Sequence, residues 1–408
     1  MSGSVSGYGV AVIAPARPDA VPARGHAWFR GLRLRDAVEC VDLADPSPLD
    51  RGGLWVVVAE FDGPGRAWRF AEALREPGAG FPSAGLPGAG APVPDATATT
   101  GAVSTTGADG TWAGPDRRAW RSSLDRAAYV EGVGAIRSRI RAGDVYQVNL
   151  CRVLSAALPG TAGADAAEPD AAALGARLAA VHPAPFAGGI HVPASSGLPP
   201  AWVVSASPEL FLRVADGRIT SGPIKGTATS EQGLSDKDAA ENVMIADMVR
   251  NDLQRVCVPG TVEVSALLEV QRHPGLVHLV TTVTGRLLDV GWGAVLGATF
   301  PPASVSGAPK HTALQTITDL EPVRRGPYCG AFGWVDADAG RAELAVAIRS
   351  FWWRADDRLL RFGTGAGITW GSDAEAEWAE TELKAERLVR LAGREGARMG
   401  PVDGGSGT

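Results

Sequence analysis

The 408-residue sequence predicts an α+β fold built on large antiparallel sheets. Many strand-like runs follow one another with hairpin-like connections, and segments with helical periodicity lie between blocks of these runs. Regular alternation of strand and helix is missing, which disfavours a Rossmann fold. The glycine-rich stretch "GTGAGITWG" (363–371) follows a strand but opens no helix, so it is not a dinucleotide-binding fingerprint.

The composition is that of a globular protein without a marked charge. Apolar residues make up 45% of the chain, the net charge is −6, and Lys and Arg form no run longer than a local pair. Nucleic acid and anionic membranes are therefore not expected as main partners. A small anion remains compatible with this charge, because its site needs only two or three placed cations.

Cysteine spacing and the absence of long apolar runs predict a cytoplasmic protein. The four cysteines form no CxxC motif, which favours reduced thiols over a disulfide frame or a zinc site. The N-terminus has no basic start followed by a sustained apolar core, and no run of about 18 apolar residues occurs. We therefore expect neither a signal peptide nor a transmembrane helix.

Residues 1–119 are the least regular part of the predicted fold. One clear strand, "LWVVVAEF", covers 54–61, and "GRAWRFAEALRE" (65–76) predicts a short helix. The stretch 77–110 is rich in Gly, Ala, Pro and Thr and almost uncharged, so it predicts a flexible insertion.

From residue 120 onwards the elements are better defined. "SSLDRAAYVEGVGAIRSRIRAGD" predicts a helix, and further helices are expected at 236–256, 308–319 and 373–392. Strand-like runs between them include "VYQVNLCRVL", "AWVVSAS", "ELFLRV", "VHLVTTVTGRLL", "AELAVAIRSFWW" and "LLRFGTGAGITW". A smaller insertion is expected at 159–169 and a disordered tail at 393–408.

Lys225 is the only ionisable residue of "SGPIKGTATS" (221–230). A lysine in a turn-forming stretch is commonly exposed to solvent. It can also be a nucleophile if its amine is unprotonated. The motif alone leaves both interpretations open.

Two helices carry carboxylates three residues apart. Asp238 and Glu241 share one helix face, and Glu377 and Glu380 repeat the spacing with Lys384 one turn on. Such pairs can converge on a hard divalent cation such as Mg²⁺. They can equally mark a solvated helix face, and Glu380 with Lys384 can form an ordinary i, i+4 pair.

Four other positions carry candidate chemistry. Glu209 follows Ser-Pro between two strands, where it is either a general acid or a strand-edge carboxylate. His278 lies in an apolar strand and is either reactive or a bonded core residue. Arg349, a lone cation in an apolar strand, needs an anionic partner from the substrate or the protein. The backbone of "GTGAG" offers N–H groups to an anion or forms a plain turn.

Ten motifs in a fixed order connect these positions. They are "AGDVYQVNL", "SASPELF", "SGPIKGT", "AENVMIADMVRNDLQRV", "HLVTTVTG", "FPPASVSGAPK", "RGPYCGAFGW", "ELAVAIRS", "GTGAGI" and "EAEWAETELKAERL". The series, from about residue 120 to 392, resembles the chorismate-utilising enzymes, and within them component I of aminodeoxychorismate synthase. Residues 1–119 resemble the family more weakly.

The resemblance implies one domain of two large antiparallel sheets packed face to face, with flanking helices. It implies a Mg²⁺ that binds the ring carboxylate of chorismate and is held by Glu241 and Glu380, with Asp238 and Glu377 in or near the coordination shell. Glu209 would be the general acid for departure of the C4 hydroxyl, and His278 would lie beside the reacting carbons. The residues expected to bind the substrate are Arg349, Tyr328, Thr281, Gly365, Ala366, Gly367, Lys384 and Gln147.

Two positions distinguish the reactions of this family. Enzymes that add water to chorismate carry a lysine where this chain has Gln147, and a neutral amide cannot act as that base. Anthranilate synthases carry alanine in the equivalent "PIAGT", where this chain has Lys225. The resemblance therefore implies that Lys225 attacks C2 of chorismate and that ammonia then adds at C4, giving 4-amino-4-deoxychorismate.

The resemblance also implies partners. No nucleophilic cysteine lies in a glycine-rich turn, so ammonia would come from a separate glutamine amidotransferase subunit. The N-terminal part lacks an "LLES"-like segment, so tryptophan feedback is not expected. Two alternatives stay open, an anthranilate synthase component I and a non-catalytic partner subunit that binds chorismate. Whether the product feeds folate, through para-aminobenzoate, or a secondary metabolite is also open.

Overall fold

The computed structural model describes residues 24–75, 112–160, 167–228, 230–273 and 276–394. The insertion expected at 77–110, most of that at 159–169 and most of the tail expected at 393–408 lie outside these residues. In the described part of the chain, no helix combines the length and apolar character that a membrane-spanning helix requires.

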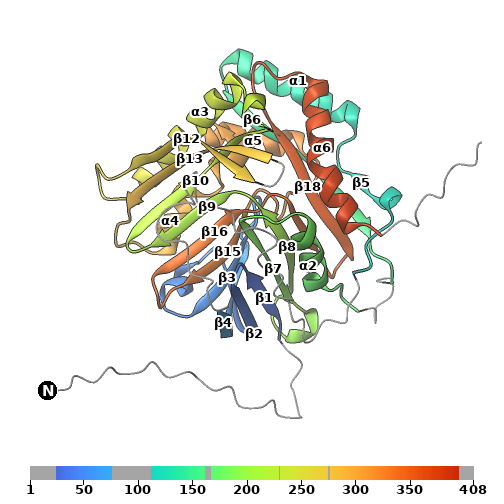
Figure 1. Ribbon diagram of the computed structural model, residues 1–408, viewed down its shortest axis with the longest axis vertical. Coiled ribbons are helices and arrows are strands. Elements are labelled where there is room, and N and C mark those ends of the chain that lie inside the picture. Colours follow the sequence, from blue (N-terminus) through green and yellow to red (C-terminus); the bar gives the residue numbers. More distant parts are fainter. Residues whose placement is uncertain (1–23, 76–111, 161–166, 229, 274–275, 395–408) are drawn as a thin grey trace, which may run out of the picture.

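Hydrogen bonds join the eighteen strands of the described residues into one antiparallel network (Figure 1). The strands are β1 (His26–Phe29), β2 (Leu32–Asp42), β3 (Leu54–Ala59), β4 (Arg66–Arg75), β5 (Arg121–Ser122), β6 (Gln147–Ala157), β7 (Phe186–Val192), β8 (Ala201–Ser207), β9 (Leu210–Ala215), β10 (Arg218–Gly222), β11 (Ile224–Ala228), β12 (Glu263–His273), β13 (Leu276–Arg286), β14 (Gly307–Ala308), β15 (Ala331–Asp336), β16 (Arg341–Val346), β17 (Ser350–Trp353) and β18 (Leu359–Ile368).

The network divides into two halves that meet where β1 pairs with β2. One half runs β1-β7-β8-β17-β18-β6, with the short β5 and β14 along the outer edge of β6. The other runs β2-β4-β3-β15-β16-β9-β10-β13-β12, with β11 beside β13. Side chains from both halves share one hydrophobic core. The predicted α+β class with two large antiparallel sheets is confirmed.

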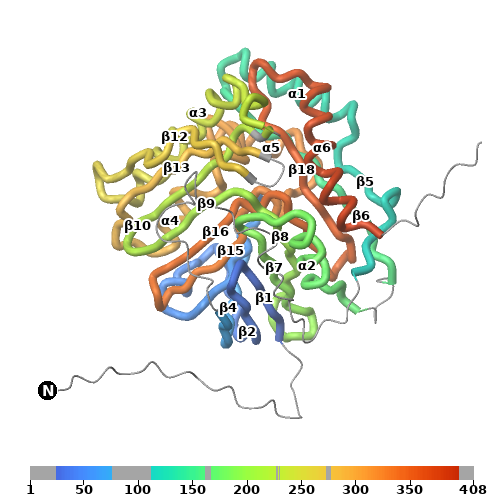
Figure 2. Tube along the Cα trace, viewed as in Figure 1, coloured from blue at the N-terminus to red at the C-terminus, as the bar shows by residue number. Residues whose placement is uncertain are grey.

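Helices cover the outer faces of this network (Figures 1 and 2). They are α1 (Arg126–Ala142), α2 (Ala171–Val181), α3 (Asp236–Gln254), α4 (Trp292–Thr299), α5 (Lys310–Leu320) and α6 (Ala374–Ala392). α6 packs against β18 and α1, α2 against β7 and β8, and α3 against β11 and β13. α3 and α6 therefore approach the sheets near β11 and β18, the strands that carry Lys225 and the "GTGAG" stretch.

The predicted helices are confirmed because their sequences contain their own start signals. α3 begins with a capping box, in which the Ser235 side chain accepts from the Asp238 N–H and the Asp238 side chain accepts from the Ser235 N–H. At the start of α6, Asp373 accepts from the Ala376 N–H. The sequence did not predict α2, α4 or β12.

The helix predicted at 65–76 is wrong, because this segment forms β4. Ala67, Trp68 and Phe70 are buried, and β4 pairs with β2 on one edge and β3 on the other. Backbone bonding on both edges outweighs the helical preference of "AEALR" (71–75), whose side chains are exposed. The N-terminal part thus contributes β1 to β4, where the sequence predicted one strand.

A buried ion pair between Glu321 and Arg325 holds the end of α5 against β6. Their side chains are 6% and 1% exposed, and the guanidinium contacts the carboxylate through Nε at 2.8 Å and Nη2 at 2.6 Å. Arg325 also donates to the carbonyls of Asn149 and Val305, and Glu321 accepts from the Cys151 N–H. The pair therefore fixes the backbone of β6 from both sides of Leu150.

We expect Glu321→Ala to destabilise the protein by about 3–5 kcal/mol, because it leaves the Arg325 charge buried without its partner. Asp247→Ala, which breaks the exposed Asp247–Arg250 pair, should cost less than about 1 kcal/mol. Urea unfolding of both variants measures the two free energies. Equal losses would contradict a structural role for the buried pair.

Candidate active site

The floor of the candidate site is a strip of bare backbone on β18. Residues directly opposite each other on antiparallel strands project to the same face. The opposed pairs of β18 and β6 are Gly363 with Val153, Gly365 with Cys151 and Gly367 with Asn149. A Cβ on Gly365 would lie 2.5 Å from Cys151 Sγ, so a side chain there would displace β6.

Three polar groups from β6 and β11 converge above Gly367. A Cβ on Gly367 would lie 2.6 Å from Gln147 Nε2, 3.1 Å from Lys225 Nζ and 3.2 Å from Asn149 Oδ1. The three groups therefore pack over the Cα of Gly367, and a side chain at this position would displace them. The structure thus brings together Lys225, Gln147 and the "GTGAG" stretch.

Lys225 lies within β11 and not in a turn, so the interpretation as an exposed turn lysine is wrong. Burial of the amine lowers its pKa below the usual value. The carboxylates of Glu241, Glu209 and Glu380 act in the opposite direction, and the charge of Lys384 lowers the pKa further. The net decrease favours the neutral, nucleophilic amine.

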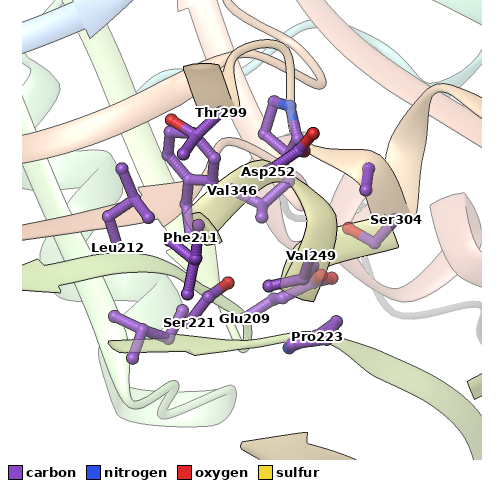
Figure 3. A pocket seen from close by; sticks show the side chains of 14 residues that line it. Glu209, Phe211, Leu212, Ser221, Pro223, Val249, Asp252, Thr299, Ser304 and Val346 are labelled. Atoms are coloured by element: carbon purple, nitrogen blue, oxygen red, sulfur yellow. The ribbon is translucent and has the colours of Figure 1, made fainter. Parts of the chain in front are cut away.

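Glu209 is a buried carboxylic acid beside Lys225. Its side chain is 3% exposed, and burial raises its pKa to about 7. This rise is only partly opposed by hydrogen bonds from Ser304 and the Ile224 N–H and by the positive charges of Lys225 and Arg349. Figure 3 shows Glu209 with Ser304 and Pro223 at the wall of a small cavity. A carboxyl with this pKa can donate a proton near neutral pH.

Arg349 does not lie inside a strand, as the sequence predicted, but between β16 and β17. Its φ is 53°, which an extended strand does not permit. The break occurs because β16 pairs with β9 in one half of the network and β17 with β8 in the other. Arg349 therefore lies where the chain crosses between the halves. Its Nη1 is 3.3 Å from His182 Nε2, and its positive charge lowers the pKa of Glu209.

Carboxylates of α3 and α6 face each other across a lysine. Lys237 Nζ lies 3.7 Å from Glu241 Oε1 and 3.6 Å from Glu377 Oε1. Burial raises the pKa of Glu241, and the negative charge of Glu377 adds to this effect while Lys225 and Lys237 oppose it. α3 and α6 therefore concentrate negative charge around the ammonium group of Lys237.

Glu380 connects this region to the glycine strip. Its carboxylate lies 2.6 Å from Lys384 Nζ, which also donates to the carbonyl of Gly365 at 3.2 Å. Burial alone would raise the pKa of Glu380, but Lys384, Lys225 and Lys237 together lower it. Glu380 therefore forms the i, i+4 pair with Lys384, and this pair adjoins the glycine strip through the Gly365 carbonyl.

Among the described residues, no three Asp, Glu, His or Cys side chains are grouped so that they could hold a metal ion as they stand. The carboxylates of α3 and α6 nevertheless have the donor type that a hard divalent cation takes. Glu241, Glu377 and Glu380 supply the oxygen donors that Mg²⁺ prefers, and the ammonium of Lys237 between two of them marks a place where positive charge is stabilised. Asp238 is less available, because its carboxylate closes the capping box of α3.

One edge of β18 is open beside these groups. β17 pairs only with residues 360–362 of β18, and Lys384 bonds the Gly365 carbonyl on that edge. In an antiparallel strand, the N–H and C=O of one residue point to the same edge. The N–H groups of Gly365 and Gly367 therefore point away from β6, where an anion can accept from them. Ala366 is 1% exposed, so its side chain is not available to a ligand.

The remaining predicted residues are buried in the core next to these groups. Thr281 is fully buried, donates to the Asn242 side chain on α3 and accepts from the Leu268 N–H, so its hydroxyl supports the helix beside Glu241. Tyr328 is buried, and its ring lies where a side chain on Gly363 would be. His278 is 2% exposed in β13, opposite β11.

Two polar residues of this region were missed by sequence reasoning. Lys237 carried no motif of its own. Asn149 had one available signal, since it lies two residues after Gln147 and therefore on the same face of β6.

Comparisons with known proteins identify the family of the chain. Residues 95–390 match the family model described as chorismate binding enzyme. The chain belongs to this family. It is 37% identical over 285 residues to an anthranilate synthase component 1 of Saccharolobus solfataricus, and 35% identical over 284 residues to an aminodeoxychorismate synthase component 1 of Salmonella typhimurium. Each alignment covers 66% of this chain, and 63% and 59% of the respective relatives, so the chain matches about three fifths of their length.

Solved structures of chorismate-binding enzymes share the fold. A putative isochorismate synthase of Bacillus anthracis superposes with a TM-score of 0.69 at 20% identity, covering 91% of this chain and 97% of that one. An anthranilate synthase component I of Streptococcus pneumoniae superposes with a TM-score of 0.65 at 20% identity, covering 93% of this chain and 95% of that one. Because these enzymes include different activities, membership in the family leaves the reaction of this member to be argued from its site.

We expect Glu209→Gln to alter the pH dependence of stability. Glu209 ionises near 4.5 when unfolded and near 7 when folded, so the folded state binds its proton more tightly and native stability falls as pH rises between these values. Glutamine does not ionise. Relative to the native protein, the variant should therefore gain up to about 3 kcal/mol between pH 5 and pH 8. Urea unfolding at both pH values measures the free energies of the two proteins. If their difference in stability is the same at pH 5 and pH 8, the raised pKa of Glu209 is contradicted.

Proposed function

We propose that the chain aminates chorismate at C4 to 4-amino-4-deoxychorismate, as component I of an aminodeoxychorismate synthase. The observation that carries the proposal is the position of Lys225 within β11, where its amine packs over Gly367 beside Gln147 and Asn149 and has a lowered pKa. An alanine at this position would leave space for ammonia to attack C2. Here the lysine amine occupies that space and attacks C2 itself.

Lys225 and Glu209 divide the first step between them. The Lys225 amine forms a bond to C2, the ring double bonds shift, and the C4 hydroxyl leaves as water with the proton of Glu209. The raised pKa of Glu209 keeps that proton available near neutral pH. Lys225 and Glu209 are close enough for their charges to shift each other's pKa.

Gln147 supports the choice of amination over hydration. Its neutral amide cannot remove a proton from water, so no base is present at the position where water-adding members carry a lysine. The side chain is 1% exposed, and its Nε2 lies 2.6 Å from the position that a Cβ on Gly367 would take. It therefore offers a hydrogen-bonding group beside Lys225 in place of a base.

The remaining groups bind the two carboxylates of chorismate. Glu241, Glu377 and Glu380 would hold Mg²⁺, which supplies positive charge to the ring carboxylate. Arg349, Lys384 and the N–H groups of Gly365 and Gly367 would receive the other carboxylate. Tyr328, Thr281, Ala366 and Asp238 would position these groups, and His278 would border the reacting ring from β13.

Ammonia would be supplied by a glutamine amidotransferase subunit, in keeping with the "component 1" naming of the relatives. An anthranilate synthase component I is the second candidate, because relatives with that name have comparable identity, 37% against 35%. The lysine at 225, in place of a small residue, favours amination at C4.

The purified chain should convert chorismate to 4-amino-4-deoxychorismate when Mg²⁺ and ammonium are present, and chelation with EDTA should stop turnover until Mg²⁺ is restored. Chromatography with mass spectrometry identifies the product. Glutamine should replace ammonium only after a glutaminase subunit is added. Anthranilate as the product would overturn the proposed reaction, and full activity in EDTA would overturn the role of Mg²⁺. No turnover under any of these conditions would favour a non-catalytic, chorismate-binding subunit.

Lys225→Ala should reduce formation of the 4-amino product by at least about a hundredfold, because the nucleophile for C2 is lost. The small side chain leaves space at C2, so direct attack by ammonia should yield a trace of anthranilate. The same product assay measures both compounds, with Arg141→Ala, an exposed cation of α1, as the control outside the site. A Lys225→Ala protein with native 4-amino product formation would exclude the covalent step.

A further inference from the structure

The side chain of Asn149 is aimed at the point above Gly367 by bonds to its backbone. Asn149 lies directly opposite Gly367 in the β6–β18 ladder. Its N–H donates to the Ser306 carbonyl at 2.8 Å, and its carbonyl accepts from Arg325 Nη2 at 2.8 Å. Both bonds lie on the edge of β6 that faces away from β18, so they fix the backbone there while the side chain lies over the glycine strip.

Two amide oxygens at this place have no hydrogen-bond partner among the described residues. They are Asn149 Oδ1 and Gln147 Oε1. The two side chains are 6% and 1% exposed, so solvent does not satisfy these acceptors. A buried acceptor without a donor is costly, and native proteins leave few of them. Since both residues lie on the same face of β6, one ligand that carries several hydrogens can satisfy both oxygens.

We propose that Asn149 and Gln147 form the binding site for the attacking ammonia, a role that rests on the amination proposed above. A hydroxyl group of the substrate offers one hydrogen and satisfies one acceptor. Ammonia offers three, so it can donate to both oxygens and keep its lone pair directed at the ring. Lys225 Nζ and Asn149 Oδ1 lie 3.1 Å and 3.2 Å from the same Cβ position on Gly367, so ammonia bound to Asn149 would lie beside the amine that has attacked the ring.

The second step then balances within the site. The ammonia lone pair forms the C4–N bond, the ring double bonds shift back, and the bond from C2 to Lys225 Nζ breaks with its electron pair returning to the amine. The new C4 ammonium group transfers a proton to the Glu209 carboxylate, which lost its own proton to the departing water. Lys225 and Glu209 regain their initial protonation states, and chorismate plus ammonia gives 4-amino-4-deoxychorismate plus water.

The test measures the KM for ammonium and the KM for chorismate separately, at constant pH and ionic strength with Mg²⁺ present. Asn149→Leu and Gln147→Met each remove an acceptor at nearly constant volume. Each should raise the KM for ammonium about tenfold, the effect of one lost hydrogen bond, and leave the KM for chorismate within about twofold. Asn251→Leu, the same change at an exposed position of α3, should alter neither constant.

The outcomes separate this proposal from the reaction on which it rests. A native KM for ammonium in a folded Asn149→Leu protein would overturn the ammonia site alone, as would an equal rise in both constants. If circular dichroism shows that Asn149→Leu does not fold, Gln147→Met decides by the same criteria. A native protein that forms no 4-amino product at any ammonium concentration would overturn both the reaction and the site.

Discussion

The arrangement of the site depends on the buried pair of Arg325 and Glu321. A guanidinium in the core is stable only when its donors are satisfied, and Arg325 meets this requirement with Glu321 and two backbone carbonyls. One of these carbonyls belongs to Asn149. The Arg325–Glu321 pair, which neutralises a buried charge, therefore also fixes the backbone of β6. This strand carries Gln147 and Asn149, so the pair holds the polar face of β6 in place.

The site lies where the two halves of the strand network come together. β6 and β18 belong to one half, whereas β11, which carries Lys225, belongs to the other. Arg349 lies at the crossing between β16 and β17, in a conformation that neither strand could contain. Groups from both halves thus reach one point, and the shared core holds the halves together there.

Elements with local signals could be predicted from the sequence, and elements that depend on distant partners could not. α3 and α6 were predictable because caps and periodicity lie in the same segment. β4 was not, since its helical preference is outweighed by β2 and β3. Lys225 was recognised by motif, but its desolvation depends on residues of other elements. Asn149 was missed because its unpaired oxygen exists only once β18 lies opposite.

The balance of charge in the site bears on the need for a cation. Each carboxylate at the site has a cationic neighbour. The carboxylates are Glu209, Glu241, Glu377 and Glu380, and the cationic side chains are Lys225, Lys237, Lys384 and Arg349. The proposed attack requires a neutral Lys225 and a protonated Glu209, so the three remaining carboxylates face three cations. Chorismate would add two carboxylates to a region that is already partly desolvated. A divalent cation between α3 and α6 would offset that addition, and Lys237, which lies between the same carboxylates, would then have to move aside or share them.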